Sequence, residues 1–307
     1  MRLAHLTDLH LPIPHPPRPH ELMSKRLLGY LSWRRNRQFR HTQGALEALA
    51  EDYRRQAVDF AAISGDLVNI SLESEFSAAS QWLEANFDAS ASAFTPGNHD
   101  AYVRMDWRAG LGALARYMVG DRGGETREPR DPEDFPFVRL IDGVGLVFAN
   151  SSPPTAPGLA TGKLGPAQIE RIGGALRRLG EAALCRVLVL HHPVTDDATP
   201  QRKALVDRKA LRATLRDAGV ELVLHGHTHR SIWAEIETKD GARPIIGGGS
   251  ASHPHPHREY RPARYNLIEI SGSAGEGWRI DVAVRELDCE SGAVKTAENR
   301  TFMARRS

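Results

Sequence analysis

The chain alternates short apolar runs with segments in which apolar residues recur every three or four positions. That spacing predicts amphipathic helices, as in Leu46, Leu49 and Tyr53, whereas the short continuous runs have the length and composition of buried strands. The runs predicted as buried strands are 3–7, 58–64, 93–95, 186–190 and 220–224. This order predicts an α/β fold, and two α/β halves that give two packed sheets flanked by helices fit it.

The remaining segments have more varied patterns. Helices are predicted from Thr42, from Ser71, over 106–118, from Pro166 and over 203–218, and a hairpin is predicted at 137–149 around Asp142 and Gly143. Residues 120–136 are charged and rich in glycine and proline, which predicts an exposed loop. After His229 the chain is predicted to be mostly β, at 232–237, 244–246, 265–270 and 278–284. With no internal repeat or low-complexity linker, we expect one domain over 1–307.

Polar residues with metal-binding side chains follow each of the predicted buried strands. Because functional sites of open α/β sheets lie at the carboxyl ends of the strands, we expect these side chains to meet. Imidazole and carboxylate groups are good ligands for Zn, Mn or Fe, and residues spaced i, i+2 on an extended backbone point to the same side. By the same alternation His5 is predicted to be a packed, hydrogen-bonded residue. The polar groups are Asp8-Leu9-His10, Gly65-Asp66, Gly97-Asn98-His99-Asp100, His191-His192 and His225-Gly226-His227-Thr228-His229.

This ordered set resembles the motifs of the calcineurin-like metallophosphoesterase family, D-x-H, G-D, G-N-H-[DE], H and G-H-x-H. The resemblance spans most of the chain and implies an α/β/β/α sandwich, two mixed sheets flanked by helices. It also implies a centre of two divalent metal ions, which can be Mn, Fe, Zn or Co because the ligands are mixed N and O donors. Two such ions can bind phosphoryl oxygens, generate hydroxide for attack at neutral pH and stabilise the leaving oxygen.

The resemblance also implies a role for each motif residue. The first ion would take Asp8, His10, Asp66 and His229, and the second would take Asp66, Asn98, His191 and His227, with Asp66 as the bridge. His99 would contact the phosphate or protonate the leaving group, and we expect Asp100 to orient it. Of the adjacent pair His191 and His192, only one can face the metals, and the resemblance favours His191.

Several further polar residues have no assigned role. His192 and His225 are expected to hydrogen-bond nearby or to support the ligands. His253, His255 and His257 alternate with prolines and could form either a polar loop or the rim of the site. Tyr102 and Arg104 lie close enough to His99 in sequence to reach the substrate.

The segment 21–41, part of a predicted insertion at about 18–41, is basic and apolar, and Glu21 is its only acid. One interpretation is a helical insertion that packs its apolar side on the domain and exposes its arginines. The alternative is an interfacial segment that contacts anionic lipid or guides an amphiphilic substrate to the metals.

Composition limits the remaining choices. The net charge of +2 and the lack of an added basic region give no indication of nucleic-acid binding. Two cysteines in no metal or disulfide pattern, and an N-terminus without a signal peptide, favour a cytoplasmic protein, with peripheral membrane contact as the alternative. The oligomeric state has no sequence signal.

The activity predicted from these observations is hydrolysis of a small phosphodiester. Leu67-Val68-Asn69 after Asp66 differs from the D-R-G of the protein phosphatase branch. The sequence resembles the bacterial cyclic-nucleotide and glycerophosphodiester phosphodiesterases more closely, although these often have Asp at the position of Asn69. The alternatives are a pyrophosphatase acting on a nucleotide-linked lipid of the UDP-diacylglucosamine type, which segment 21–41 motivates, and a non-catalytic scaffold, which the complete ligand set disfavours.

Overall fold

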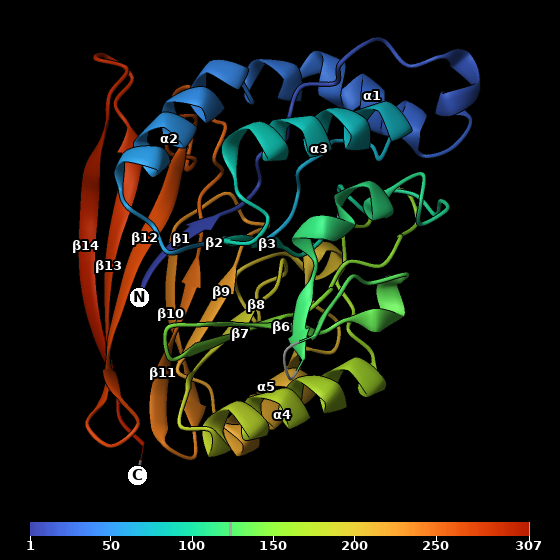
Figure 1. Cartoon of the computed structure of the whole chain (residues 1–307). Helices are drawn as coiled ribbons and strands as arrows, with labels where there is room; N and C mark the ends of the chain where they lie inside the picture. Colours follow the sequence, from blue (N-terminus) through green and yellow to red (C-terminus); the bar gives the residue numbers. More distant parts are fainter. Residues whose placement is uncertain (123–124, 307) are drawn as a thin grey trace.

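The computed structural model describes residues 1–122 and 125–306, which form two six-stranded mixed sheets stacked between helices (Figure 1). The first sheet has the order β14-β13-β12-β1-β2-β3, and the second has the order β10-β11-β9-β8-β7-β6. The helices α1, α2 and α3 lie above the sheets in Figure 1, and α4 and α5 lie below. The predicted α/β/β/α sandwich is therefore confirmed.

The bounds of the elements follow the predicted alternation through most of the chain. The helices are α1 (Arg26–Arg35), α2 (Gln43–Arg55), α3 (Glu73–Asn86), α4 (Pro166–Glu181) and α5 (Arg208–Ala218). The strands of the first sheet are β1 (Arg2–Leu6), β2 (Phe60–Ile63), β3 (Ser92–Phe94), β12 (Arg264–Ser273), β13 (Gly277–Leu287) and β14 (Val294–Ala304). Those of the second are β6 (Phe137–Ile141), β7 (Val144–Phe148), β8 (Cys185–Val189), β9 (Leu222–His225), β10 (Ile232–Thr238) and β11 (Gly241–Gly247).

Each sheet contains a set of parallel strands that is almost entirely buried. β1, β2 and β3 run parallel to one another, as do β7, β8, β9 and β11. Their continuous apolar runs fit strands that are covered on both faces. As a result, one edge of the sandwich holds the carboxyl ends of five strands: β1, β2, β3, β8 and β9.

Aromatic and aliphatic residues together form the large buried cluster of the core, and aliphatic residues fill the space under α4 and α5. The rings of Phe137 and Phe148 stack with centroids 4.9 Å apart, and Phe60 lies 6.4 Å from Phe148. On the outer face of the second sheet, Ile172 of α4 and Leu211 of α5 belong to a separate buried cluster. The central strands are thus held between two apolar layers.

Three predicted segments differ from the structure. Residues 106–118 form turns and a 3-10 helix, Leu111–Tyr117, because Gly110 and Gly112 disfavour a regular helix. The segment 120–136 holds a short hairpin, β4 (Gly120–Arg122) and β5 (Glu125–Arg127), and a 3-10 turn at Pro132–Asp134. β14 was not predicted, since the exposed side of an edge strand carries polar residues and lacks a clear apolar alternation.

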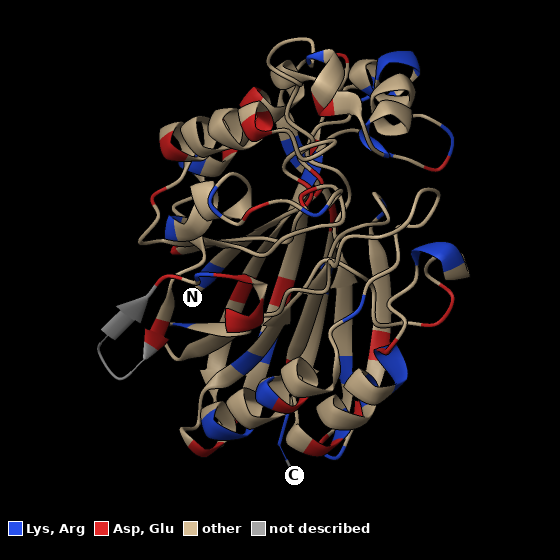
Figure 2. Ribbon diagram, turned by 90° about the vertical axis from the view of Figure 1, so that its right-hand side faces the viewer, with Lys and Arg blue, Asp and Glu red and all other residues tan. Residues whose placement is uncertain are grey.

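Charged residues occur on helices and loops of both outer layers (Figure 2). None of the helices in the described part of the chain is long and apolar enough to cross a membrane.

Candidate metal centre

The seven predicted ligands converge where the central strands end. Asp8 and His10 follow β1, Asp66 follows β2, Asn98 follows β3, His191 follows β8, and His227 and His229 follow β9. All are buried except His229, which is partly exposed. Because the loops come from both sheets, the cluster lies across the boundary between them.

Four of these residues form the first ligand group. The ligand atoms of Asp8, His10, Asp66 and His229 all lie within 4.8 Å of one another. His229 Nε2 is 3.1 Å from Asp8 Oδ1 and 3.2 Å from His10 Nε2. Asp8 Oδ1 is buried and has no hydrogen-bond donor in the described part of the chain. A cation between these atoms would satisfy this oxygen and the imidazole lone pairs together.

The second group lies on the other side of Asp66. His191 Nε2 is 3.2 Å from Asn98 Oδ1, 3.2 Å from His227 Nδ1 and 3.4 Å from Asp66 Oδ2. The same Asp66 oxygen is 3.8 Å from His10 Nε2 of the first group. Asp66 Oδ2 therefore faces both groups, which is the position a bridging carboxylate requires.

Hydrogen bonds on the other side of the ligands turn the required atoms inward. In three imidazoles, the ring nitrogen that faces away from the ligand groups is hydrogen-bonded to a backbone carbonyl oxygen. The distances are 2.8 Å from His191 Nδ1 to Ser64 O, 2.9 Å from His227 Nε2 to Lys203 O, and 3.3 Å from His10 Nδ1 to Val68 O. A carbonyl can only accept, so that nitrogen carries the proton and the inward nitrogen keeps its lone pair for a metal.

The two carboxylates are held in the same manner. The backbone N–H of His99 donates to Asp66 Oδ1 at 2.7 Å, and that of His227 donates to Asp8 Oδ2 at 3.0 Å. In each case the opposite oxygen faces the ligand groups. Burial would raise the pKa of Asp8, but the nearby His229 and His191 lower it to about 2. The carboxylate is therefore ionised, as a metal ligand must be.

The ligand loops have a strained backbone that the sequence reasoning did not anticipate. Five of the ten described non-glycine residues with positive φ are predicted ligands: Asp8, His10, Asp66, His227 and His229. The assumption of an extended backbone at the i, i+2 pairs was therefore wrong. The left-handed turns send His227 to the second group and His229 to the first. Strain of this kind costs on the order of 1–3 kcal/mol per residue and clusters at functional sites.

Two motif glycines allow the loops to approach. A Cβ on Gly97 would lie 2.2 Å from Asp66 Oδ1, and a Cβ on Gly226 would lie 1.8 Å from Thr7 Oγ1 and 2.8 Å from Asp8 Oδ2. Any side chain at either position would displace a carboxylate of the cluster.

His99 lies beside the ligand groups, but Asp100 does not orient it. His99 Nδ1 is 2.6 Å from the carbonyl oxygen of Asn69, and Nη1 of Arg37 is 3.0 Å from the same ring nitrogen. The Asp100 carboxylate instead accepts hydrogen bonds from the backbone N–H groups of 66, 67, 68 and 97, at 2.7–3.0 Å. The predicted contact was wrong, because Asp100 faces the loop that carries Asp66. Burial and the adjacent Arg37 lower the pKa of His99 to about 3.

The family model for calcineurin-like phosphoesterases matches residues 1–231, which include all seven ligands. The chain belongs to the calcineurin-like phosphoesterase family. It is therefore related to metal-dependent phosphoric ester hydrolases, and the Asp and His residues of the first group are able to hold a metal ion. No curated protein sequence matches the chain.

Solved structures share the fold of this phosphoesterase at low sequence identity. A dimetal phosphatase from Danio rerio has a TM-score of 0.62 at 13% identity, with 99% of each chain covered. A purple acid phosphatase from yellow lupin, Lupinus luteus, has a TM-score of 0.56 at 12% identity, and the match covers 98% of this chain and 53% of that one. These similarities support the fold alone.

Three histidines of the phosphoesterase lie outside the ligand groups, as expected for His5 and His192. His5 Nε2 is 2.9 Å from Ser64 Oγ, and His192 Nδ1 is 2.9 Å from Ser151 Oγ. His225 is buried with Nδ1 3.0 Å from the Gly226 carbonyl, and its Nε2 has no partner among the described residues.

Two other histidines extend the first group. The His253 ring is 5.3 Å from that of His229, with Nε2 3.4 Å from His229 Nδ1. His41, which the motifs do not include, has its ring 4.4 Å from His10 and its Nδ1 2.6 Å from Ser252 Oγ. His255 and His257 are exposed, so of the three histidines between prolines only His253 reaches the site.

The ligand groups form the floor of a cavity of about 310 Å³. Its wall includes Lys25, Arg37, Arg40 and Lys203, together with Tyr102, whose ring stacks on His99 at 5.7 Å. Three of these cations come from segment 21–41. The sequence analysis left open a contact between this segment and the substrate, but it did not identify these side chains as part of the cavity wall. Arg104 does not line this cavity.

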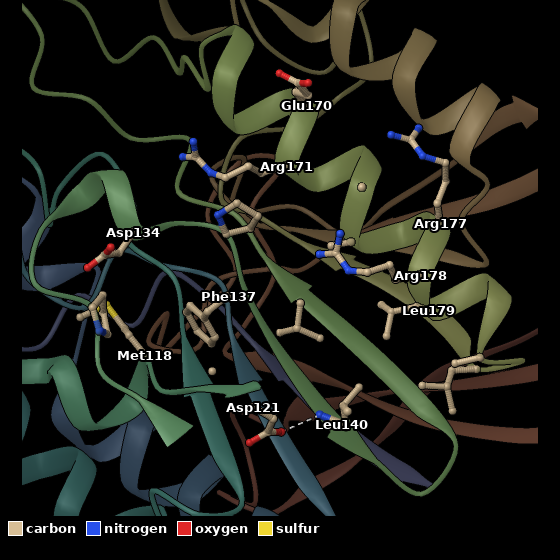
Figure 3. Close-up of a pocket in the computed structure, with 18 of the residues that line it drawn as sticks. Met118, Asp121, Asp134, Phe137, Leu140, Glu170, Arg171, Arg177, Arg178 and Leu179 are labelled. Carbon is tan, nitrogen blue, oxygen red and sulfur yellow. Dashed lines mark hydrogen bonds between the residues drawn. The ribbon is translucent and has the colours of Figure 1, made fainter. Parts of the chain in front are cut away.

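A larger hollow of about 760 Å³ lies elsewhere, between β6 and α4. Figure 3 shows it bordered by Arg171, Arg177 and Arg178 of the helix and by Asp121, which accepts a hydrogen bond from the Leu140 N–H at 2.8 Å. It contains no predicted ligand and no histidine, so we assign the chemistry to the smaller cavity.

Proposed function

We propose that this phosphoesterase is a phosphodiesterase that uses two divalent metal ions, of Mn, Fe or Zn, to hydrolyse a small phosphodiester such as a cyclic nucleotide or a glycerophosphodiester. The observation that carries the proposal is the position of Asp66 Oδ2 between His10 and His191. Asp8, His10, Asp66 and His229 would hold the first ion, and Asp66, Asn98, His191 and His227 the second. The ions would supply charge neutralisation and lower the pKa of water.

The protein residues around this centre have separate tasks in the proposal. His99 would contact the phosphate, since its ring borders the cavity and its backbone N–H holds Asp66. A pKa of about 3 makes this imidazole neutral at neutral pH, and a neutral imidazole is better suited to hydrogen bonding with the phosphate than to acting as a general acid. Asp100 would fix the loop of Asp66. We also propose that the protein is cytoplasmic and that residues 1–307 form one domain.

The experiment is hydrolysis of bis(p-nitrophenyl) phosphate and of its monoester by metal-free protein titrated with Mn²⁺, with bound metal measured in parallel. Diester cleavage that requires metal, and that Asn98→Ala loses, supports the proposal. A protein that binds two metal ions without cleaving the diester or other phosphodiesters would be the scaffold alternative. Failure to bind metal would refute the proposal.

A second candidate substrate is a nucleotide-linked lipid, and segment 21–41 supports it. In and beside α1, Met23, Leu28 and Phe39 have exposed fractions of 84%, 59% and 70%, and Leu27 and Leu31 are also exposed. Only part of the apolar side packs on the protein, through Leu22, Tyr30 and Trp33. Exposed apolar residues among arginines at the rim of the cavity fit contact with an anionic lipid surface.

Vesicle sedimentation tests this candidate with matched variants. Leu28→Ser combined with Phe39→Ser is expected to reduce binding to vesicles containing phosphatidylglycerol and cleavage of the lipid diphosphate presented in them. Val206→Ser combined with Met303→Ser removes exposed apolar residues elsewhere and serves as the control. Equal binding by both double variants and the unmodified protein would rule out the lipid contact.

A further inference from the structure

Four cations line the metal cavity without carboxylate partners. Lys25, Arg37 and Arg40 come from the segment before α2, and Lys203 comes from the 3-10 turn Gln201–Lys203. None of the four forms an ion pair with a carboxylate in the described part of the chain, whereas Arg208 and Arg212 nearby both pair with Asp196. The wall therefore carries positive charge that no ion pair among the described residues neutralises.

These cations are held in place on two sides of the ligand groups. Lys25 donates from Nζ to the Thr155 carbonyl at 2.8 Å and lies 4.3 Å from the centre of the Tyr102 ring, which stacks on His99. Arg37 contacts the His99 ring directly, with Nη1 3.0 Å from Nδ1. Together they form a layer that runs outward from His99.

Lys203 borders the second ligand group. Its carbonyl accepts the hydrogen bond of His227, so its side chain starts beside a predicted ligand. Arg37 and Lys203 both line the cavity, so they face a common space. Partly buried cations without a carboxylate partner are costly, and a bound anion removes that cost.

We propose that this wall, with Arg37 and Lys203 at its centre, binds a second phosphate of the substrate beside the phosphate that the metal centre receives. Arginine is suited to bidentate contact with phosphate, and lysine supplies a compact charge. The scissile group of a simple phosphodiester has one negative charge, and two divalent ions, which the Asp8 and Asp66 carboxylates offset only in part, would neutralise it without the wall. The substrate class is therefore a diphosphate diester. The inference rests on the proposed function and, between its two candidates, favours the diphosphate.

The test compares AMP and ADP, which differ by one phosphate, as ligands of the Mn-loaded protein. Affinity is measured by titration calorimetry at constant excess Mn²⁺, with metal content checked and the nucleotide recovered intact. The variants are Arg37→Gln and Lys203→Gln. The controls are Arg35→Gln and Arg202→Gln, which remove exposed charges close to the same two positions.

We expect ADP to bind at least about tenfold more tightly than AMP, and each wall variant to reduce that preference by about tenfold or more, as for a lost hydrogen bond to a charged group. The controls are expected to keep the preference. Equal affinities for AMP and ADP, an unchanged preference in the wall variants, or an equal loss in the controls would overturn the inference. Because the measurement needs no turnover, it is separate from the diester assay, whose failure would refute the proposed function.

Discussion

The floor and the wall of the cavity are built in different ways. The floor consists of ligands such as Asp66 and His227, which are buried, hydrogen-bonded on their outer side and placed by strand ends of both sheets. The wall is made largely by residues 21–41, whose side chains are partly exposed and which pack on the protein through few apolar contacts. In the proposed function, the floor would supply the chemistry and the wall would select the substrate.

The largest expected effect comes from removing the bridge in the floor. Asp66→Asn takes away the charge shared by both ligand groups, so we expect both metal ions to be lost. Diester hydrolysis should fall by more than the ~10–100-fold typical for outer partners of metal ligands. Metal analysis and kinetics measure this, with Arg37→Gln as the wall variant that keeps its metals. Two tightly bound ions in Asp66→Asn would contradict the bridging role.

The glycines of the floor test how closely the loops must approach. Gly97→Ala places a methyl group against the Asp66 carboxylate and backbone, so we expect a loss of about 1–3 kcal/mol in the free energy of unfolding together with weaker metal binding. Gly44→Ala in α2 is the control, because no atom lies within 4 Å of its Cβ. We expect it to stabilise the protein by up to about 1 kcal/mol. Urea denaturation distinguishes these results, and equal stability of both variants would show that the loops can adjust.

Variants of Asp100 and His99 are expected to differ, because Asp100 would support the metal site and His99 would contact the substrate. Asp100→Asn replaces an acceptor of four backbone hydrogen bonds, so we expect metal affinity to fall by roughly 10–100-fold. His99→Asn should retain the metal ions and lower kcat. Metal titration and diester kinetics on the two variants check this. If both variants kept full metal affinity, Asp100 would not support the metal site.

The smallest effect is expected at the outer surface of the wall. Leu28→Ser should change the free energy of unfolding by no more than about 0.5 kcal/mol, because the side chain is more than half exposed. Thermal denaturation with and without Mn²⁺ measures it. A larger loss would mean that Leu28 packs against the protein, and the distinction between floor and wall would weaken.

The sequence predicted the floor well, because the motif order and the strand ends determine which side chains meet. It did not predict the left-handed backbone at His227, which local alternation cannot show, or the position of Asp100, which depends on contacts with another loop. Arg37 and His41 were missed because they reach the site only when the segment before α2 folds over it. β14 was missed because an edge strand lacks the apolar alternation of a buried one.

The separation of the ligands along the chain has a consequence for folding. His10 and His229, whose Nε2 atoms lie 3.2 Å apart, are 219 positions apart in sequence. Closing so long a loop is entropically costly and depends on both sheets having already formed and docked. We therefore expect the proposed metal centre to be complete only late in folding, so metal uptake during refolding would report formation of the native state.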